Sequence, residues 1–488
     1  MTVTEAPVQV LPDTGLLIAD RRIHDPSGGV HRHVYAGTGR QTAEVPLGGA
    51  REMDEAVAAA RQAQARWQAM PADRRRDLML RLAGLIKVNA ERLTAMQILE
   101  AAVPRRFAGS FPNAAADFLA YNAGWADKLG GEVVGSWPAR ALDYTLDEPF
   151  GVVAVIIPWN GPLAAIGQLL GPVLAAGNAA VIKPPELAPF TSLCVGELIL
   201  EAGFPPGLVN VVPGGAEGGT ALARHPGVDK IHFTGSPATA RKVLAAAQQN
   251  LTPVGLELGG KSAHLIFADA DIKAAARQAL SGAVVLSGQG CVNGTRVLAE
   301  APVYDEVLRL MESGLRRITV GDPFAQGTWM GPLVTEAACE RVMRVIEHAS
   351  AAGHGRLIVG GERLGGELAA GYFISPAVFA DVVHGSDLAQ QEIFGPVLSV
   401  MKFENEKHAI ELANDTRYGL GGYVHTTDLR RAHRVSKALA VGNVWVNGFY
   451  GISPAMPFGG IKQSGHGRLG GRAGIREFTR PKNIWIAM

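Results

Sequence analysis

Cysteine is scarce in this chain of 488 residues, which contains only Cys194, Cys291 and Cys339. An odd and sparse set of cysteines does not make the disulfide framework of a small secreted domain. Sparse cysteine is typical of proteins in reducing compartments. The sequence therefore excludes the disulfide-stapled extracellular class, and each cysteine has to be explained as a thiol.

A signal peptide and long apolar runs are also missing. Residues 1–5 contain no basic start that leads into an apolar core. Elsewhere, Gly, Pro or Asn breaks each apolar run well short of the length needed to span a membrane. We expect a cytoplasmic protein that does not associate with a membrane.

No excess of one charge is present, because 46 basic residues face 45 acidic ones and leave a net charge of +1. No basic run stands out, so nucleic-acid binding lacks its usual electrostatic basis. The 13 histidines show no pair at metal-ligand spacing with a nearby cysteine or acid. We therefore expect no nucleic-acid partner and no metal site.

The length of 488 residues suits two or three domains, and apolar residues, at 47% of the chain, are enough for a large core. From residue 151 on, apolar runs typical of strands alternate with helical stretches, which predicts a parallel sheet with helices on both faces. Such sheets bind ligands at the carboxyl ends of their strands. The expected strands are 151–158, 178–184, 208–213, 230–234 and 253–258, and the expected helices are 162–175, 189–203, 217–224 and 237–249.

The rest of the chain shows other patterns. Residues 1–50 are rich in Gly and Pro and predict an irregular lead-in, and residues 131–149 alternate as a hairpin does. Helical spacing and strand patterns predict three early helices and a second β/α set after residue 260. The expected helices are 53–69, 74–89 and 91–100, and the second set includes strands 264–267 and 397–400.

Cys291 lies in a glycine-rich stretch, Ser287 to Arg296, with three glycines in seven positions. Glycine permits backbone conformations closed to other residues and leaves room beside the sulfur for a reactant. A cysteine kept for packing more often lies in an apolar run. These residues alone leave two readings open: a reactive thiol, or a buried inert cysteine on a glycine-rich turn.

Glu257 decides between these readings. It follows an apolar run and is closed off by Gly259 and Gly260, within Leu-Glu-Leu-Gly-Gly-Lys-Ser. A carboxylate beside Val254 and Leu256 is costly unless it is paired or has a task. Desolvation would raise its pKa toward the range useful for a general base. The alternative is a helix-capping or ion-paired carboxylate.

Together these two stretches resemble the aldehyde dehydrogenase superfamily, and the likeness runs from about residue 30 to the C-terminus. The resemblance implies that Cys291 is the nucleophile and Glu257 the general base. It also assigns Asn160, in Pro-Trp-Asn, to the oxyanion hole together with the backbone N–H of Cys291. On its own, Asn160 would be better explained as the cap of the helix beginning near Pro162, and the other motifs favour the oxyanion hole.

The resemblance also implies the fold class: α/β, with a Rossmann-like parallel-sheet cofactor domain, a second α/β catalytic domain and a small β arm for oligomerisation. We expect the NAD-binding domain at 1–130 and 150–259, the catalytic domain at 260–470, and the arm at 131–149 and 476–488. Edge strands invite pairing, so a homodimer or homotetramer is expected. An ordinary surface hairpin is the alternative for the arm.

Three motifs imply a dinucleotide site. Lys183 and Glu186 match residues on the adenosine ribose, where a carboxylate favours NAD over NADP, although a surface ion pair is the alternative. The Ser236 helix start suits phosphate, with Ala240 where the family has glycine. Glu392 matches the nicotinamide-ribose residue. The full expected set is Ile156, Pro158, Trp159, Lys183, Glu186, Gly215, Gly219, Phe233, Thr234, Gly235, Ser236, Leu258, Glu392 and Phe394.

Small and uncharged residues near the expected site indicate which kind of aldehyde the protein binds. Gly161 stands where relatives commonly carry an aromatic residue, Ala164 and Ala165 are small, and residues 448–456 carry no charge. Apolar pockets favour apolar ligands, so a bulky, uncharged aldehyde, aromatic or terpenoid-like, is expected. The expected substrate residues are Gly161, Ala165, Gly290, Val292, Ile452 and Phe458.

Two positions depart from the family pattern. Leu169 and Leu469 stand where many relatives carry a lysine and a glutamate that contact each other near the general base. Loss of both charges for apolar residues can be neutral or stabilising, whereas loss of one strands a buried charge. We therefore expect one compensated change, which leaves Glu257 in drier surroundings without a charged neighbour on that side.

Two rival functions remain open. In an acylating enzyme, coenzyme A rather than water takes the acyl group, but Glu257 would then have no water to activate. In a non-catalytic protein that keeps the fold, the residues expected to act in catalysis and cofactor binding would have no purpose. Glu257 argues against the acylating enzyme, and the intact set of Cys291, Glu257, Asn160, Lys183 and Glu392 argues against the non-catalytic protein.

Overall fold

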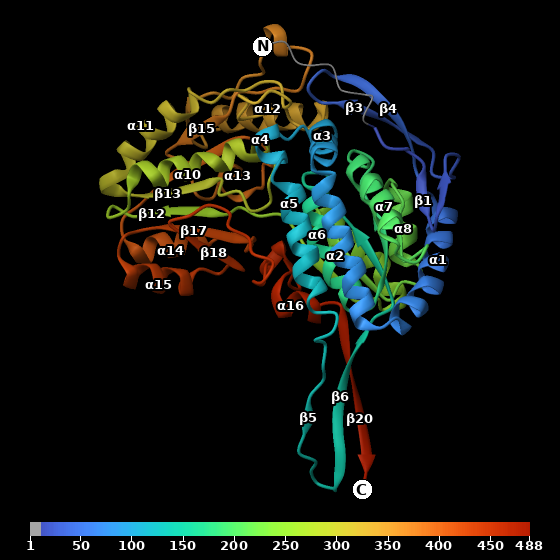
Figure 1. Cartoon of the computed structure of the whole chain (residues 1–488). Helices are drawn as coiled ribbons and strands as arrows, with labels where there is room; N and C mark the ends of the chain where they lie inside the picture. Colours follow the sequence, from blue (N-terminus) through green and yellow to red (C-terminus); the bar gives the residue numbers. More distant parts are fainter. Residues whose placement is uncertain (1–10) are drawn as a thin grey trace.

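The computed structural model describes residues 11–488, so the expectation for residues 1–5 lies outside it. Two large sheets, each covered by helices, lie beside each other, and a thin arm projects from the body (Figure 1). This arrangement is the predicted α/β fold with a small antiparallel arm.

The first sheet has eight strands in the order β19-β11-β10-β7-β8-β9-β1-β2. Its five central strands are parallel and are the five expected from the sequence. They are β7 (Val152–Ile156), β8 (Ala179–Lys183), β9 (Val209–Val211), β10 (Lys230–Thr234) and β11 (Val254–Glu257). The helices between them are α6 (Pro162–Ala175), α7 (Phe190–Ala202), α8 (Ala216–Arg224) and α9 (Pro237–Ala247).

The expectation of an irregular lead-in is wrong for the described part of residues 1–50. Short strands form there: β1 (Leu16–Ile18), β2 (Arg21–Ile23), β3 (Val30–Tyr35) and β4 (Arg40–Pro46). β1 reaches the first sheet through one residue pair, Leu17 with Val211, and β3 pairs with β4 as a hairpin. Gly and Pro mark the turns between these strands, and because the strands are short the turns dominate the composition.

The early helices are confirmed as α1 (Ala50–Ala69), α2 (Ala72–Val88) and α3 (Ala90–Ala101), followed by α4 (Arg105–Ala108) and α5 (Phe111–Ala123). α5 lies against α6 at two glycines. A Cβ at Gly167 would lie 2.6 Å from the Ala115 Cα, and one at Gly171 would lie 2.9 Å from Asn122 Nδ2. These glycines allow the close helix contact that fixes α6, the helix after Asn160.

The second sheet has seven strands in the order β14-β15-β16-β13-β12-β17-β18. Its strands are β12 (Ala263–Ile266), β13 (Arg296–Glu300), β14 (Arg356–Val359), β15 (Ala377–Ala380), β16 (Val397–Phe403), β17 (Gly421–His425) and β18 (Asn443–Val446). Its helices are α10 (Ile272–Val284), α11 (Tyr304–Leu315), α12 (Glu336–Ala351), α13 (Asp387–Gln390), α14 (Glu406–Asn414) and α15 (Leu429–Ala438).

The chain passes between the two sheets at the expected glycine pair, because β11 ends at Glu257 and β12 begins at Ala263. It also returns: β19 (Gly465–His466), before α16 (Gly471–Arg476), pairs with β11 at the edge of the first sheet. The division into domains at these residues stays a prediction.

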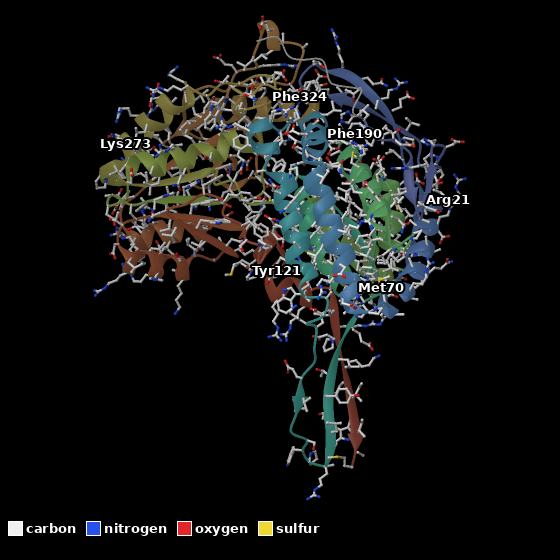
Figure 2. All side chains as sticks on the ribbon, in the orientation of Figure 1. Arg21, Met70, Tyr121, Phe190, Lys273 and Phe324 are labelled. Atoms are coloured by element: carbon white, nitrogen blue, oxygen red, sulfur yellow. The ribbon has the colours of Figure 1, made fainter. Side chains whose placement is uncertain are left out.

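The arm consists of β5 (Val133–Val134), β6 (Ala141–Pro149) and β20 (Thr479–Ala487). β20 pairs antiparallel with β6 along its whole length, which joins the two segments expected to form it. The rest of the chain does not cover the arm's side chains (Figure 2). Its exposed apolar residues are Val133, Val134, Trp137, Leu142, Leu146, Trp485, Ile486 and Met488.

Within residues 11–488, no helix combines the length and the apolar character needed to cross a bilayer. The cytoplasmic location stays a prediction.

Candidate active site

A pocket of about 610 Å³ opens at the carboxyl ends of the first sheet's parallel strands and reaches the second sheet. All three residues expected to be catalytic and all fourteen expected around the cofactor line it. They come from segments that are far apart in the sequence. The sheet topology therefore brings together what separate motifs indicated, although their roles remain predictions.

The Gly259–Gly260 pair lies at the centre of this pocket. A Cβ at Gly259 would lie 1.9 Å from Glu392 Oε2, and one at Gly260 would lie 2.6 Å from the Cys291 carbonyl oxygen. The Gly260 N–H donates to Glu392 Oε1 at 3.0 Å. The absence of two side chains thus lets the Glu392 loop and the Cys291 loop pack on the end of β11.

The backbone before Cys291 takes an unusual course. Leu286, Ser287 and Gly288 all have positive φ, at 53°, 54° and 73°. For residues other than glycine this conformation costs about 1–3 kcal/mol and persists where the surroundings hold it. Here Ser287 Oγ donates to the Gly331 carbonyl at 2.9 Å, and a Cβ at Gly288 would lie 2.2 Å from the Gly395 backbone. The loop is therefore held tightly on both sides.

The Cys291 thiol is held in its protonated form in the free protein. Burial raises its pKa to about 12, and the carboxylates of Glu392 and Glu257 add to this rise. The backbone N–H groups of Cys291 and Val292 oppose it. A thiolate in this pocket therefore depends on these N–H groups and on positive charge brought by a ligand.

Asn160 points at the cysteine loop. Its Nδ2 donates to the Gln289 carbonyl at 2.7 Å. The alternative that it caps the following helix is wrong, because Gly161 is the N-cap residue of α6 and no side-chain cap bond is formed there. Asn160 thus places an amide donor from the first sheet beside the Cys291 loop of the second.

Glu257 is buried, and neither of its carboxylate oxygens has a hydrogen-bond partner in the described chain. Burial raises its pKa well above the ordinary value; Arg468 lowers it and Glu477 raises it. Such a carboxyl is protonated more easily and is a stronger base once it has lost its proton.

The expectation that Glu257 lacks a charged neighbour near Leu469 is wrong, because Arg468 lies close by. A Cβ at Gly459 would lie 2.8 Å from Glu257 Oε1 and 3.0 Å from Arg468 Cδ. The guanidinium itself donates to the Gly460 and Gly467 carbonyls at 2.8 and 2.6 Å. The positive charge of Arg468 is thus turned toward backbone oxygens. Burial therefore remains the main influence on Glu257 and raises its pKa.

At the other end of the pocket, Lys183 ends β8 and Glu186 follows it. Lys183 is buried, which lowers its pKa, while Glu186 raises it. A Cβ at Gly215, the N-cap residue of α8, would meet nothing within 4 Å, so this glycine leaves open space at the wall of the pocket. These groups suit a ligand with hydroxyl groups.

Ser236 is the N-cap residue of α9, and its Oγ accepts from the Thr239 N–H at 3.2 Å. The start of this helix lines the pocket, as expected from the sequence. Ala240, where the family has glycine, lies buried behind it. A helix start of this kind favours a phosphate group.

Phe394 and Trp159 form the pocket wall near Glu392, edge to face with ring centroids 5.6 Å apart. Phe394 has a positive φ of 51°. Arg341 of α12 holds this turn, because its Nη1 donates to the Ile393 carbonyl at 2.5 Å. Arg341 was not expected at the site; it lies on another helix, with no sequence motif around it.

Other lining residues were also not expected: Ile157, Pro185, Leu187, Ala216, Thr220, Ala223, Thr239, Lys242, Val243, Ala246 and Gly259. Most of them follow an expected residue on the same helix or strand end. Thr239 and Lys242 are the clearest case, since helical spacing from Ser236 places them on one face of α9.

The residues expected to contact the substrate do not line this pocket. A Cβ at Gly161 would meet only Ala164, at 3.9 Å, so there is open space beside it. Gly290 has a different reason to be small: a Cβ there would lie 2.6 Å from Asn293 Oδ1. Val292 is buried. The structure therefore does not gather the six expected substrate residues in one pocket, as it does the residues expected around the cofactor.

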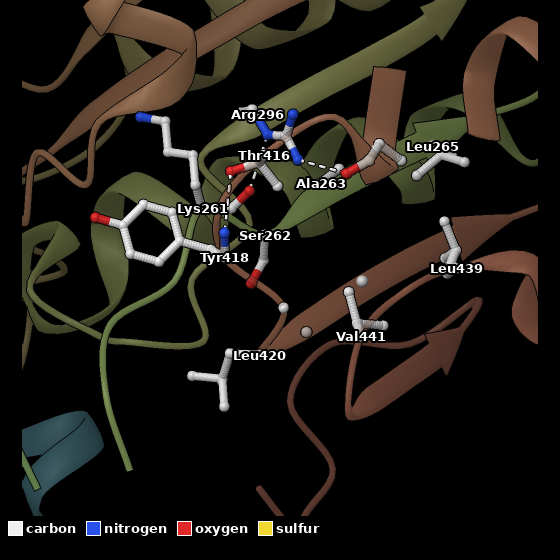
Figure 3. Close-up of a pocket in the computed structure, with 14 residues that line it drawn as sticks. Lys261, Ser262, Ala263, Leu265, Arg296, Thr416, Tyr418, Leu420, Leu439 and Val441 are labelled. Carbon is white, nitrogen blue, oxygen red and sulfur yellow. Dashed lines mark hydrogen bonds between the residues drawn. The ribbon is translucent and has the colours of Figure 1, made fainter. Parts of the chain in front are cut away.

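A second, much smaller cavity of about 10 Å³ lies beside the residues that follow the glycine pair (Figure 3). Lys261, Ser262 and Arg296 line it. Arg296 donates to the Lys261, Leu412 and Ala413 carbonyls at 2.8, 3.0 and 2.8 Å. Burial, aided by Arg296, lowers the pKa of Lys261 to about 7. Arg296 thus ties together the backbone beside this cavity.

The family model described as the aldehyde dehydrogenase family matches residues 25–484. The chain belongs to the aldehyde dehydrogenase family. The expected fold class and the expected family are thereby confirmed, and aldehyde dehydrogenases are oxidoreductases.

Similar proteins cover nearly the whole chain. An aldehyde dehydrogenase of Aspergillus niger is 42% identical over 438 residues, 89% of this chain and 87% of the relative. The crystal structure of PnpE from Pseudomonas sp. WBC-3 has a TM-score of 0.94 at 38% identity over 97% of both chains. Betaine aldehyde dehydrogenase from Staphylococcus aureus, in complex with NAD+, has a TM-score of 0.96 at 33% identity over 98% of this chain and 96% of that chain.

The two departures from the aldehyde dehydrogenase pattern generate a prediction. Leu169 on α6 and Leu469, two residues before α16 begins, are both buried in the core of the first sheet. The helices α6 and α16 are in contact. Leu169→Lys or Leu469→Glu alone should destabilise the fold by about 3–5 kcal/mol, because each buries an unpaired charge. The double change should recover much of this loss, as measured by thermal unfolding. If the losses of stability in the two single variants simply add up in the double variant, the two side chains do not interact.

Proposed function

We propose that the protein oxidises an aldehyde to the carboxylic acid with NAD, with Cys291 as nucleophile and Glu257 as general base. One observation carries the proposal: Cys291 from the second sheet and Glu257 from the first line the same pocket. An inert cysteine on a turn would have no reason to face an unpaired buried carboxyl.

The residues suit a covalent route. The Cys291 sulfur, as thiolate, attacks the aldehyde carbon and forms a thiohemiacetal. Its oxyanion is stabilised by the Cys291 N–H and by the Asn160 amide, which is already aimed at this loop. NAD, when bound, would accept the hydride from this carbon, which would leave a thioester on Cys291. Glu257 then takes a proton from water, whose oxygen attacks the thioester and releases the acid and the thiol.

The pocket fits NAD in size and in chemistry. Its volume of about 610 Å³ is typical of a cofactor site, and it presents Glu186 for ribose hydroxyl groups and the α9 start for phosphate. A carboxylate at this place disfavours a 2′-phosphate, so NAD is preferred over NADP. The S. aureus relative that was crystallised with NAD+ supports this choice.

The substrate proposal is a bulky, uncharged aldehyde, aromatic or terpenoid-like. Open space beside Gly161 supports it. Two arginines that could hold a second carboxylate are already engaged: Arg105 pairs with Glu91 at 3.0 Å, and the Arg106 guanidinium lies 3.1 Å from the centroid of the Trp329 ring. Neither arginine lines the pocket.

The arm supports self-association as a dimer or a dimer of dimers. Its outer strand β20 leaves one edge unpaired within the described chain. Exposed edges and apolar side chains such as Trp485 and Ile486 favour pairing with a second copy.

The catalytic roles can be separated by substitution. Cys291→Ala should abolish NADH formation. Glu257→Gln should still form the thioester but not hydrolyse it, and so should give a burst of NADH followed by little turnover. Ultraviolet absorbance of NADH, recorded with and without coenzyme A, measures both. Turnover of Glu257→Gln at close to the wild-type rate would refute the base assignment, and turnover that requires coenzyme A would favour the acylating reaction.

Burial of Glu257 predicts a pH dependence. Since its pKa is raised well above the ordinary value, the base form increases as the pH rises, and kcat should increase through the alkaline range. The folded chain also keeps this proton to a higher pH than the unfolded chain. The carboxyl's contribution to stability is therefore present at acid pH and lost as the pH rises through the folded pKa.

Pre-steady-state rates and melting temperatures across pH measure both effects. The melting temperature of the wild type should fall between acid and alkaline pH by more than that of Glu257→Gln. A thioester hydrolysis rate that stays flat from neutral to alkaline pH would contradict the raised pKa.

The substrate proposal predicts the highest kcat/KM for aromatic or terpenoid-like aldehydes in a panel of aldehydes. Gly161→Phe should lower kcat/KM for these bulky aldehydes by about tenfold or more while sparing acetaldehyde, because the ring would fill the open space. Highest kcat/KM on succinic semialdehyde would contradict the proposal.

If the arm joins subunits, the protein should form oligomers in a concentration-dependent way. Deletion of residues 482–488 removes most of β20 and should shift the protein toward monomer in light scattering at micromolar concentration. The control is Leu429→Ala, which removes an exposed apolar side chain away from the arm. A wild-type protein that is monomeric under the same conditions would refute the assembly.

A further inference from the structure

A stack of rings lies under the Cys291 loop. His264, Tyr423 and Trp445 stand at directly paired positions of the neighbouring parallel strands β12, β17 and β18 (Figure 1). The His264 and Tyr423 rings are 4.3 Å apart with planes 14° apart, and the Tyr423 and Trp445 rings are 4.9 Å apart with planes 18° apart. Phe449 stacks at 5.4 Å from Tyr423. Tyr423 is therefore fixed from several sides.

The Tyr423 hydroxyl reaches the cysteine loop. Tyr423 is fully buried, and its Oη donates to the Val292 carbonyl at 3.0 Å. Val292 directly follows Cys291. A ring held by its stack thus fixes the orientation of the peptide unit after Val292.

The same stack touches the loop at a second point. A Cβ at Gly294 would lie 2.4 Å from His264 Nε2 and 3.0 Å from Tyr423 Cδ2, so the backbone rests on these two rings. Between the two contacts, Asn293 Nδ2 donates to the Gly282 and Val285 carbonyls at 3.0 and 3.1 Å. The backbone from Val292 to Gly294 therefore has little freedom to rotate.

We propose that Tyr423 is a positioning residue for the Cys291 thiol, acting through its hydrogen bond to the Val292 carbonyl. The proposal rests on the proposed role of Cys291 as nucleophile. The N–H groups of Cys291 and Val292 stabilise the thiolate, and they keep their aim only while the following peptide unit is fixed. With the Tyr423 hydroxyl removed, that unit keeps only the bond from the Asn293 N–H to the Gly290 carbonyl at 3.1 Å. It is then held less firmly, and the sulfur loses part of this stabilisation.

Tyr423→Phe is the direct test, since it keeps the ring in the stack and removes the hydroxyl. The matched control is Tyr304→Phe, which removes another buried hydroxyl that bonds to Asp381 at 2.9 Å in the second sheet, outside the pocket. Alkylation of Cys291 by iodoacetamide, followed by mass spectrometry across pH and without aldehyde, reports the thiol alone. Steady-state kinetics and melting temperatures accompany it.

Tyr423→Phe should need a higher pH than wild type for half-maximal alkylation of Cys291. Its kcat should fall roughly tenfold, equivalent to about 1.4 kcal/mol, with KM for the aldehyde within about twofold of wild type. Tyr304→Phe should change neither the alkylation profile nor kcat. Since alkylation needs no aldehyde or NAD, this readout stands apart from the activity of Cys291→Ala, which tests the proposed function.

A Tyr423→Phe alkylation profile and kcat that match those of Tyr304→Phe would overturn the proposal. A lower melting temperature with an unchanged profile would also overturn it, because the hydroxyl would then be structural only. If Tyr423→Phe does not fold, Gly294→Ala gives a second test. Its methyl group pushes the rings from the loop, so its profile should shift in the same direction, and a wild-type profile would refute the role.

Discussion

The close approach of the Gly259–Gly260 backbone to two loops of the second sheet is the contact on which the site depends. On one side a carboxylate oxygen of Glu392 fills the space that a Cβ would take, and on the other side the Cys291 carbonyl does. Glu257, at the end of β11, is only two residues away. Any side chain at these glycines would separate the base and the nucleophile that the two sheets bring into one pocket. The strained turn before Cys291 is stable for the same reason, because tight packing on both sides holds it.

This packing also sets the electrostatics. Cys291, Glu257 and Glu392 share one pocket. Burial raises the pKa of each of them, to about 12 for the thiol and about 7 for Glu392. The two carboxylates add to the rise at the thiol, whereas burial is the main cause at each of the two carboxyl groups. Burial thus disfavours negative charge on each of these groups, and the backbone N–H groups of Cys291 and Val292 favour it at the sulfur.

The sequence predicts what local pattern and strand order determine. Alternating apolar runs located the five parallel strands, and because the carboxyl ends of such strands meet, Asn160, Lys183, Ser236 and Glu257 could be expected at one edge. It missed what depends on segments that meet only in three dimensions. Arg341 reaches the pocket from a helix without a motif, and Arg468 approaches Glu257 from a loop more than 200 positions later in the chain. Gly290 was read as room for substrate, yet its neighbour Asn293 takes that space. Tyr423 carries no local signal, since its importance lies in one hydrogen bond to another segment.

Gly260→Ala tests the central contact most directly, with NADH formation from an aldehyde and the melting temperature as readouts. Its methyl group would lie 2.6 Å from the Cys291 carbonyl oxygen, so the loop must move, and activity should fall by about 100-fold or more. Gly84→Ala is the matched control, because a Cβ at that exposed helical position meets nothing within 4 Å; it should keep full activity and gain up to about 1 kcal/mol in stability. Wild-type activity in Gly260→Ala would show that the glycine pair does not hold the nucleophile and the base together.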